Sequence, residues 1–172
     1  PHQQAQTCFP AAEPLRTLVV MTIGGNDMNA IREDSMGGAP MTETWEQTEA
    51  VVTQMSDAIH WLKDDPARFP AGVSVIFTNI YEYTDGEGDL TACPGALLAG
   101  IFGSWDAGRE PYIHVVEQYL RIAVETGSDM LFLLENFCGH GFHAGEAGNE
   151  CYRGADADTW FDLTCIHPTP TG

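Results

Sequence analysis

A histidine near the C-terminal end of the chain follows an aspartate at short range. Asp162 and His167 lie in the segment Phe161–Pro168, which Pro168 and Pro170 keep extended. A histidine held by a carboxylate is the general-base half of a nucleophilic hydrolase, because its imidazole can take a proton near neutral pH. Asp162 and His167 are therefore our first candidates for catalytic residues.

A glycine-rich turn is the second candidate. Gly24, Gly25, Asn26 and Asp27 directly follow an apolar run. The glycines allow a tight turn and a close approach of the backbone, and the Asn26 side-chain amide can donate a hydrogen bond to a developing oxyanion. The same residues also suit an asparagine turn that caps a helix, so this turn alone leaves both interpretations open.

Three apolar runs and two amphipathic segments must position these residues. Residues 42–63 and 111–126 place apolar side chains at helical spacing, whereas residues 15–23, 73–81 and 129–137 are expected to form buried strands. Strands that alternate with helices imply right-handed βαβ units and a parallel sheet covered on both faces. We therefore predict an α/β fold, a three-layer α/β/α sandwich, with ligands beyond the carboxyl ends of the strands.

The order of these motifs along the chain resembles that of the SGNH (GDSL-type) hydrolase superfamily, whose members are mostly esterases and lipases. The resemblance spans nearly the whole chain and implies a flavodoxin-like sandwich. It implies that Asn26 is the oxyanion-hole donor, on a turn shaped by Gly24 and Gly25. It further implies that His167 is the catalytic base and that Asp162 orients it. We expect no metal ion and no cofactor.

The chain departs from the SGNH pattern at two places. In the family the nucleophilic serine precedes the GGND block, but none of the 23 residues before Gly24 is a serine. We therefore expect a fragment: a single SGNH-like domain, residues 1–172, that lacks the first strand–helix–strand and the closing helix. The missing N-terminal segment is its expected partner.

The second departure concerns the acid. The family's acid usually lies three residues before the histidine, where this chain has Thr164, and Asp162 lies five before. Either the turn is enlarged, or a backbone carbonyl holds the imidazole of His167 in a Ser-His dyad.

Two serines within the chain are weaker candidates for the nucleophile. Ser35 lies in a segment that echoes Gly-Asp-Ser, but it follows the GGND block and no strand leads into it, so we expect an exposed loop serine. Ser104 is not part of a Gly-x-Ser-x-Gly elbow. We expect neither to be the nucleophile.

Aromatic residues near the predicted strand ends are candidates for substrate binding. Tyr81, Phe137 and Trp160 lie at or beyond these ends. They could line an acyl pocket or cap the hydrophobic core, and the sequence leaves both possibilities open.

Two segments carry the residue types of metal ligands. Asp85–Asp89 places carboxylates at alternate positions, but it lacks the glycine and the distal glutamate of an EF-hand, so a flexible acidic loop is favoured over a calcium site. His140 and His143 have no third ligand at helical or hairpin spacing for zinc. We favour a loop that lines the substrate cleft and that a Cys138–Cys151 disulfide closes.

The composition limits the partners and the compartment. The 172 residues include 25 acidic and 7 basic ones, a formal net charge of −18, which argues against nucleic acid or anionic membranes as partners. No apolar run reaches the ~18 residues of a membrane span. The five cysteines form no CxxC pair, and their odd number leaves one free or bonded outside the chain. A disulfide favours secretion or the periplasm.

These observations lead to two hypotheses from different classes. The first is a secreted or periplasmic serine ester hydrolase that acts on a small ester or a lipid, through a Ser-His-Asp triad or a Ser-His dyad, with the serine outside these residues. The second is a catalytically inactive, acidic binding domain on the same scaffold, with calcium as its candidate ligand, because a degenerate enzyme would show the same missing serine and displaced acid.

Overall fold

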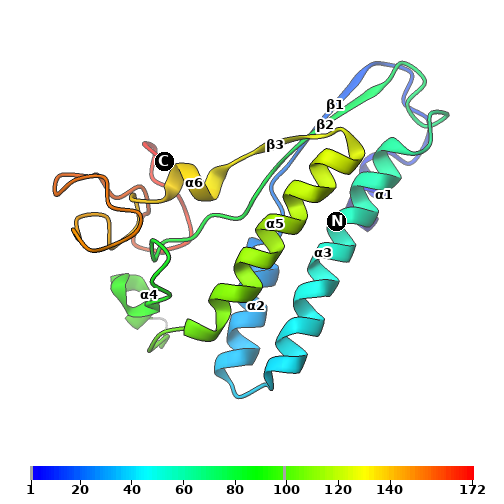
Figure 1. Cartoon of the computed structure of the whole chain (residues 1–172). Coiled ribbons are helices and arrows are strands. Elements are labelled where there is room, and N and C mark those ends of the chain that lie inside the picture. The colour runs from blue at the N-terminus through cyan, green and yellow to red at the C-terminus, as the bar shows by residue number, and fades with distance from the viewer. Residues whose placement is uncertain (1, 99) are drawn as a thin grey trace. The chain divides into compact units, whose positions relative to one another are not determined.

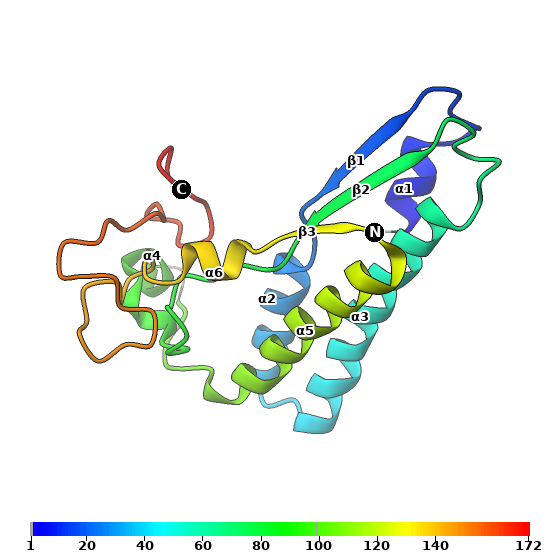
Figure 2. The same ribbon diagram turned by 45° about the horizontal axis from the view of Figure 1, so that its top comes forward.

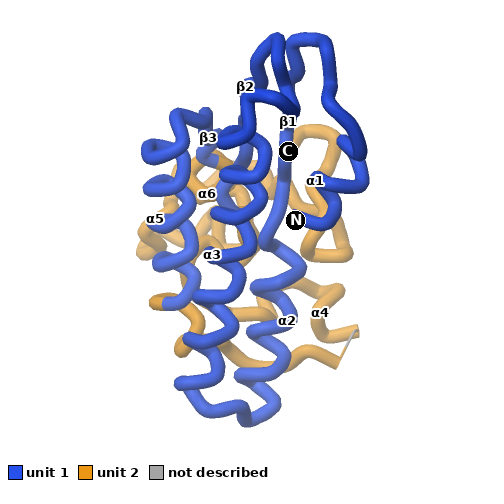
Figure 3. The backbone as a smooth tube through the Cα atoms, turned by 90° about the vertical axis from the view of Figure 1, so that its right-hand side faces the viewer, with its two compact units in different colours: residues 1–80, 111–132 blue, residues 81–110, 133–172 orange. Residues whose placement is uncertain are grey.

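A computed structural model describes residues 2–98 and 100–172 (Figure 1; Figure 2). The chain separates into two compact units, coloured blue and orange in Figure 3. Unit 1 comprises Pro1–Ile80 and Pro111–Phe132, and unit 2 comprises Tyr81–Glu110 and Leu133–Gly172. Unit 1 contains the sheet, whereas unit 2 is built largely from loops and short helices.

Unit 1 contains a parallel sheet. Its strands are β1 (Thr17–Met21), β2 (Val73–Thr78) and β3 (Asp129–Leu131), in the order β1-β2-β3. Both pairs of neighbours are parallel, with Val19 opposite Val75 in the first pair. This topology is the one that alternating strands and helices predict, because a parallel pair needs a crossover connection.

Helices provide the crossovers and cover the sheet. The chain returns from β1 to β2 through α2 (Gly25–Met36) and α3 (Met41–Lys63), and from β2 to β3 it passes through α5 (Arg109–Thr126). In Figures 1 and 2 these three helices lie on one side of the strands. The first helix, α1 (His2–Cys8), packs against α3.

The two faces of the sheet differ in burial. Val75 and Phe77 are buried, and the Phe77 ring meets Tyr119 of α5 edge to face, with ring centroids 6.1 Å apart. Leu18 and Val20 alternate with the inward residues of β1 and are 60% and 62% exposed. The expectation that this strand is buried on both sides is therefore wrong for the described residues, because no described element covers its second face.

Helix α3 follows the predicted segment closely. It runs from Met41 to Lys63, against an expected 42–63, and buries Val51, Met55 and Ile59 at a spacing of four residues. Side chains four apart lie on one face of a helix, so this stripe faces the core.

The strand predicted for residues 129–137 is wrong beyond Leu131. Residues Leu133–Phe137 form the short helix α6 instead. The neighbouring strand β2 ends at Thr78, and the last bond between the two segments runs from Asn79 N–H to Leu131 O (3.1 Å). Beyond that point an extended chain has no ladder to pair with, so a helix satisfies its backbone groups locally.

The exposed loop expected around Ser35 is also wrong, because this residue lies in α2 and is half-buried. This segment has too few apolar residues at helical spacing to predict a helix, and only Met28 and Ile31 among its apolar side chains are buried. The helix begins at the glycine turn and packs against α3. This packing, rather than the local sequence pattern, explains why the segment is helical.

Unit 2 has little regular structure. Apart from α6, its helices are α4 (Pro94–Leu98) and two 3₁₀ turns, η1 (Leu90–Ala92) and η2 (Asp106–Gly108). No described helix is long and apolar enough to cross a membrane.

Two disulfides connect the segments of unit 2. The predicted Cys138–Cys151 bond is confirmed, and a second bond joins Cys93 to Cys165, which are 72 residues apart in sequence. The remaining cysteine, Cys8, is exposed and free. The odd cysteine of the sequence is therefore Cys8.

Candidate functional site

The Gly-Gly-Asn turn joins β1 to α2 in unit 1. Gly24 is the N-cap of α2, and its carbonyl accepts the first helical hydrogen bond from Met28 N–H (2.9 Å). Asn26 lies in the first turn of the helix, where its side chain is exposed. The N-terminal end of a helix attracts negative charge, because its first N–H groups have no partner within the helix. This position suits a donor to an anion.

Only glycine fits at position 24. Its φ of 109° lies in the left-handed region, and a Cβ there would lie 2.7 Å from both Ile80 Cδ1 and the Tyr119 hydroxyl oxygen. At Gly25 a Cβ would meet nothing within 4 Å. The first glycine is therefore required by packing and backbone conformation, whereas the second is not.

The Tyr119 hydroxyl beneath this turn is buried and has no hydrogen-bond partner among the described residues. Burial raises the pKa of Tyr119 strongly, and the negative charge of Asp27 raises it further. The phenol therefore stays neutral and packs the underside of the turn.

The predicted histidine lies in unit 2 on a closed loop. Asp162 N–H donates to His167 O (3.0 Å), and an isolated antiparallel bridge pairs Phe161 with Pro168. The chain therefore leaves and returns at the same place, and residues 162–167 form an enlarged turn whose histidine is exposed.

Thr164 lies between the aspartate and the histidine. Asp162 Oδ1 accepts a hydrogen bond from Thr164 N–H (2.7 Å) and another from the Thr164 hydroxyl. The same hydroxyl oxygen lies 2.8 Å from His167 Nδ1. The hydroxyl and N–H of Thr164 hold the pKa of Asp162 below its usual range. The Thr164 hydroxyl thus connects the carboxylate of Asp162 to the imidazole of His167.

The Cys93–Cys165 disulfide ties this turn to α4. Cys165 is buried and has a positive φ of 70°. Gly95 of α4 packs so closely that a Cβ there would lie 1.9 Å from Leu163 O. The histidine loop is therefore held by a covalent bond and by close backbone packing. The sequence contains no spacing signal that pairs these two cysteines.

The predicted aromatic residues form part of a single cluster in unit 2. Tyr81 stacks on Phe137 with centroids 4.7 Å apart, and Trp160 meets Phe137 edge to face at 5.3 Å. The Tyr81 hydroxyl donates to Ile166 O (3.2 Å), next to the histidine. Burial raises the pKa of Tyr81, so the phenol remains a donor. These rings support the histidine loop from its own unit.

Trp160 also stacks on His140. The two rings are parallel within 4°, with centroids 3.7 Å apart, and His140 Nδ1 lies 2.8 Å from Asp158 O. His140 is thereby fixed between a ring and a backbone carbonyl.

The acidic segment 85–89 is an anchor rather than an open loop. The buried carboxylate of Asp85 accepts hydrogen bonds from the backbone N–H groups of Gly139 (2.8 Å), Gly141 (2.9 Å) and His143 (3.0 Å). Charge-assisted bonds of this kind are strong where water is excluded. The flexible acidic loop expected here is therefore wrong at Asp85, because its charge organises the histidine-containing loop.

Two neighbouring carboxylates accept hydrogen bonds from backbone groups close to them in sequence. Asp89 caps η1 and accepts from Thr91 N–H (2.9 Å), and these bonds with the Thr91 hydroxyl and N–H hold the pKa of Asp89 below its usual range. Glu82 accepts from Gly86 N–H (2.8 Å), although burial raises the pKa of Glu82. Both side chains thus stabilise local turns of the chain.

His143 lies close to two carboxylates. Its Nδ1 lies 2.7 Å from Glu146 Oε1, and its Nε2 lies 3.6 Å from Asp89 Oδ2. Among residues 2–98 and 100–172, no group of three or more His, Cys, Asp or Glu side chains is arranged to hold a metal ion. His143 thus lies between the carboxylates of Glu146 and Asp89 in unit 2.

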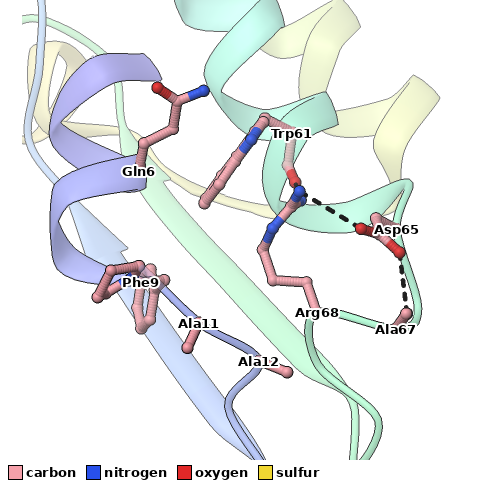
Figure 4. Close-up of a pocket in the computed structure, with 9 residues that line it drawn as sticks. Gln6, Phe9, Ala11, Ala12, Trp61, Asp65, Ala67 and Arg68 are labelled. Carbon is pink, nitrogen blue, oxygen red and sulfur yellow. Dashed lines mark hydrogen bonds and ion pairs between the residues drawn. The ribbon is translucent and has the colours of Figure 1, made fainter.

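A shallow pocket in unit 1 contains none of these residues. Figure 4 shows its lining, in which the Arg68 guanidinium lies 3.7 Å from the centre of the Trp61 ring and pairs with Asp65 (3.4 Å). Because the arginine is already stacked and paired, the pocket offers no convergent group for catalysis.

The predicted site residues thus fall in both units. Unit 2 brings together Asp162 and His167, and it also holds Tyr81, Phe137 and Trp160. Gly24, Gly25 and Asn26 lie in unit 1. Sequence reasoning did not identify the contacts that Thr164 makes with Asp162 and His167, or those that Asp85 makes with the loop at residues 139–143. The position of Thr164, three residues before the histidine, is the signal that could have identified it.

No protein-family model matches the chain, and no curated protein sequence is significantly similar to it. Among solved structures, the chain is similar to the crystal structure of phospholipase A1 from Streptomyces albidoflavus NA297. The TM-score is 0.52 at 15% sequence identity, over 95% of this chain and 68% of that chain. This likeness and the sheet topology confirm the predicted α/β fold with a parallel sheet.

Proposed function

We propose that this chain belongs to a serine ester hydrolase of the SGNH type that acts on a small ester or a lipid. The observation that carries the proposal is the histidine loop of unit 2, in which a carboxylate with a lowered pKa reaches the imidazole of His167 through Thr164. The fold likeness to a phospholipase A1 supports the same class of substrate.

The proposed reaction begins with a serine hydroxyl that attacks the ester carbonyl. His167 takes the hydroxyl proton at Nε2, and the tetrahedral oxyanion forms. The SGNH resemblance gives Asn26 the role of a donor to this oxyanion, a contribution of about 3–4 kcal/mol to transition-state stabilisation in other hydrolases. His167 then protonates the leaving alcohol, and water attacks the acyl-enzyme to release the acid.

The nucleophile is proposed to lie on a segment outside these 172 residues. Ser35 lies within a helix and Ser104 donates its hydroxyl proton to Asp106, so neither lies on a strand-to-loop turn. β1 lies at an edge of the described sheet. The outer backbone groups of an edge strand can pair with another strand, which supports the idea that a further strand of the same protein pairs there.

An oxidising compartment fits the proposal. Two disulfides hold unit 2, and bonds of this kind persist in secreted and periplasmic proteins. We therefore propose that the hydrolase works outside the cytoplasm.

The test uses the full-length protein that contains this chain and a fluorophosphonate probe, read by intact mass. We expect an adduct on a serine outside residues 1–172, no adduct in the His167→Ala variant, and ester hydrolysis that is lost in the same variant. An adduct on Ser35 or Ser104 would overturn the location of the nucleophile.

No labelling and no hydrolysis in the full-length protein would overturn the enzyme and favour the alternative, an inactive binding domain on this scaffold. Calcium-dependent melting would then mark a calcium-dependent binding function. The involvement of Asp85 and Asp89 in bonds to the chain makes that outcome the weaker expectation.

A further inference from the structure

We propose that Thr164 is a positioning residue, which transmits the charge of Asp162 to His167 and selects the tautomer that can act as a base. The proposal rests on the proposed function, because the position of the proton on the imidazole matters for catalysis only if His167 is the base of that hydrolase. It goes beyond that function by naming a hydroxyl as the link where the SGNH pattern has the acid itself.

The argument begins with the two bonds that Thr164 makes to Asp162. Its N–H lies 2.7 Å from Asp162 Oδ1, and its hydroxyl contacts the same oxygen. A carboxylate carries no proton and can only accept, so the single hydroxyl proton of Thr164 points toward Asp162. The lowered pKa of Asp162 agrees with an acceptor that remains charged at neutral pH.

The second step concerns His167. The Thr164 hydroxyl oxygen has donated its proton and keeps only lone pairs, and it lies 2.8 Å from His167 Nδ1. The bond between them therefore needs the proton on Nδ1. In the neutral ring, a protonated Nδ1 leaves Nε2 with the free lone pair.

This arrangement prepares the imidazole for general-base catalysis. Nε2 is the nitrogen that takes the proton of a nucleophile, after which the ring is positively charged. The hydroxyl and the carboxylate behind it stabilise that charge, because hydrogen bonds in a chain polarise one another. No proton needs to leave Nδ1 during the cycle.

The enlarged turn makes the link necessary. Asp162 lies five residues before His167, and its backbone N–H is bonded to His167 O (3.0 Å). The side chain at the intermediate position 164 occupies the space between the carboxylate and the ring. A threonine here extends the reach of the acid by one hydroxyl.

A purely structural role would give Thr164 a different signature. Its N–H bond to Asp162 belongs to a local turn and survives when the hydroxyl is removed. Removal of the hydroxyl alone therefore separates the structural contribution from the positioning contribution.

The experiment determines the tautomer of His167 by two-bond ¹H–¹⁵N correlation of the imidazole in the uniformly ¹⁵N-labelled full-length protein near pH 8. We expect the Nδ1–H form in the wild type. In Thr164→Val the population should shift toward Nε2–H, and Thr164→Ser should restore Nδ1–H. The matched control is Thr159→Val, which removes a hydroxyl of unit 2 that bonds only to Gly141 O (3.3 Å).

Two results would overturn the proposal. One is an Nε2–H tautomer in the wild type, a measurement that needs no variant to fold. The other is an unchanged Nδ1–H tautomer in Thr164→Val, with the backbone spectrum outside the loop preserved. If this variant does not fold, loss of Nδ1–H in Asp162→Asn and its retention in Thr164→Ser make the same distinction.

Activity separates this proposal from the proposed function. In the complete hydrolase, Thr164→Val should lower kcat by about 100-fold with KM nearly unchanged, and Thr164→Ser should recover most of it. Absence of activity in the wild type, together with the expected tautomers, overturns the enzyme and supports the hydrogen-bond chain. Full activity of Thr164→Val overturns the positioning role and leaves the enzyme standing.

Discussion

The two units of the molecule are stabilised in different ways. Unit 1 is a sheet with helices, and its buried side chains are mostly apolar residues repeated at the spacing of a strand or a helix. Unit 2 has short elements, and it is held by two disulfides, an aromatic cluster and the buried carboxylate of Asp85. Periodic burial tolerates many substitutions, whereas unit 2 depends on a small number of specific bonds.

The same difference holds for the predicted site residues that each unit contains. Unit 1 presents Asn26 on a rigid strand-to-helix turn. Unit 2 presents His167 on a loop, where flexibility is limited by cross-links and not by regular structure. If this comparison is correct, changes to the specific bonds of unit 2 should destabilise the protein more than changes to the turn of unit 1.

Removal of the Cys93–Cys165 disulfide should have the largest effect. In Cys93→Ser/Cys165→Ser, the lost closure of a 72-residue loop should lower the free energy of unfolding by about 4 kcal/mol. Hydrogen exchange should increase in residues 81–110 and 133–172 first. The matched control is Cys8→Ser, which removes an exposed free thiol and should leave stability unchanged. Equal losses of protection in both units would contradict the comparison.

Asp85→Asn should be the next most damaging change. The neutral amide cannot replace a carboxylate that accepts three backbone N–H bonds, so we expect a loss of about 3 kcal/mol in the free energy of unfolding. Glu87→Gln is the control, because its exposed side chain keeps an oxygen for Asn149 Nδ2 (3.0 Å). Thermal unfolding followed by near-ultraviolet circular dichroism measures both. Similar stabilities of the two variants would show that Asp85 is not an anchor.

Gly24→Ala tests the rigid turn of unit 1. The positive φ and the contacts with Ile80 and Tyr119 should cost about 2–3 kcal/mol in the free energy of unfolding, measured by urea denaturation. Gly25→Ala, the neighbouring control, meets nothing within 4 Å and should be tolerated. A destabilised Gly25→Ala with an unaffected Gly24→Ala would reverse our assignment of the two glycines.

The smallest effect concerns Asp162 and pH. Its pKa is lowered in the folded chain, so its contribution to the histidine loop is present above the unfolded value of about 3.9. That contribution is lost as the pH falls through the lower folded value. The Thr164 amide resonance should therefore shift below about pH 4. In Asp162→Asn, the control, the transition should be absent. A Thr164 transition centred above pH 4 would contradict the lowered pKa.

The periodic elements of unit 1 could be predicted from the sequence. Helix α3 and the parallel order of the strands follow from apolar spacing and from the alternation of segments. The strand expected for residues 129–137 failed because its apolar residues suit a strand or a buried helix equally, and the end of the neighbouring strand at Thr78 decides between them.

The candidate site could be predicted only in part. The types and positions of Asn26, Asp162 and His167 are visible in the sequence, and their roles remain a proposal. Thr164 and Asp85 could not be assigned, because a side chain acquires such a role only from what lies within hydrogen-bond distance after folding.

The α/β class could be predicted from the amino-acid sequence, as could the helix boundaries near residues 41 and 63 and the disulfide from Cys138 to Cys151. These features depend on contacts between residues that are close in sequence or repeat at a fixed period. Three other features are visible only in the folded chain: the Cys93–Cys165 bond, the anchoring carboxylate of Asp85 and the hydroxyl between Asp162 and His167. The first two join residues more than 50 positions apart in the chain. The third depends on how three polar side chains are oriented within one loop. Neither long-range pairing nor side-chain orientation can be predicted from a periodic sequence pattern.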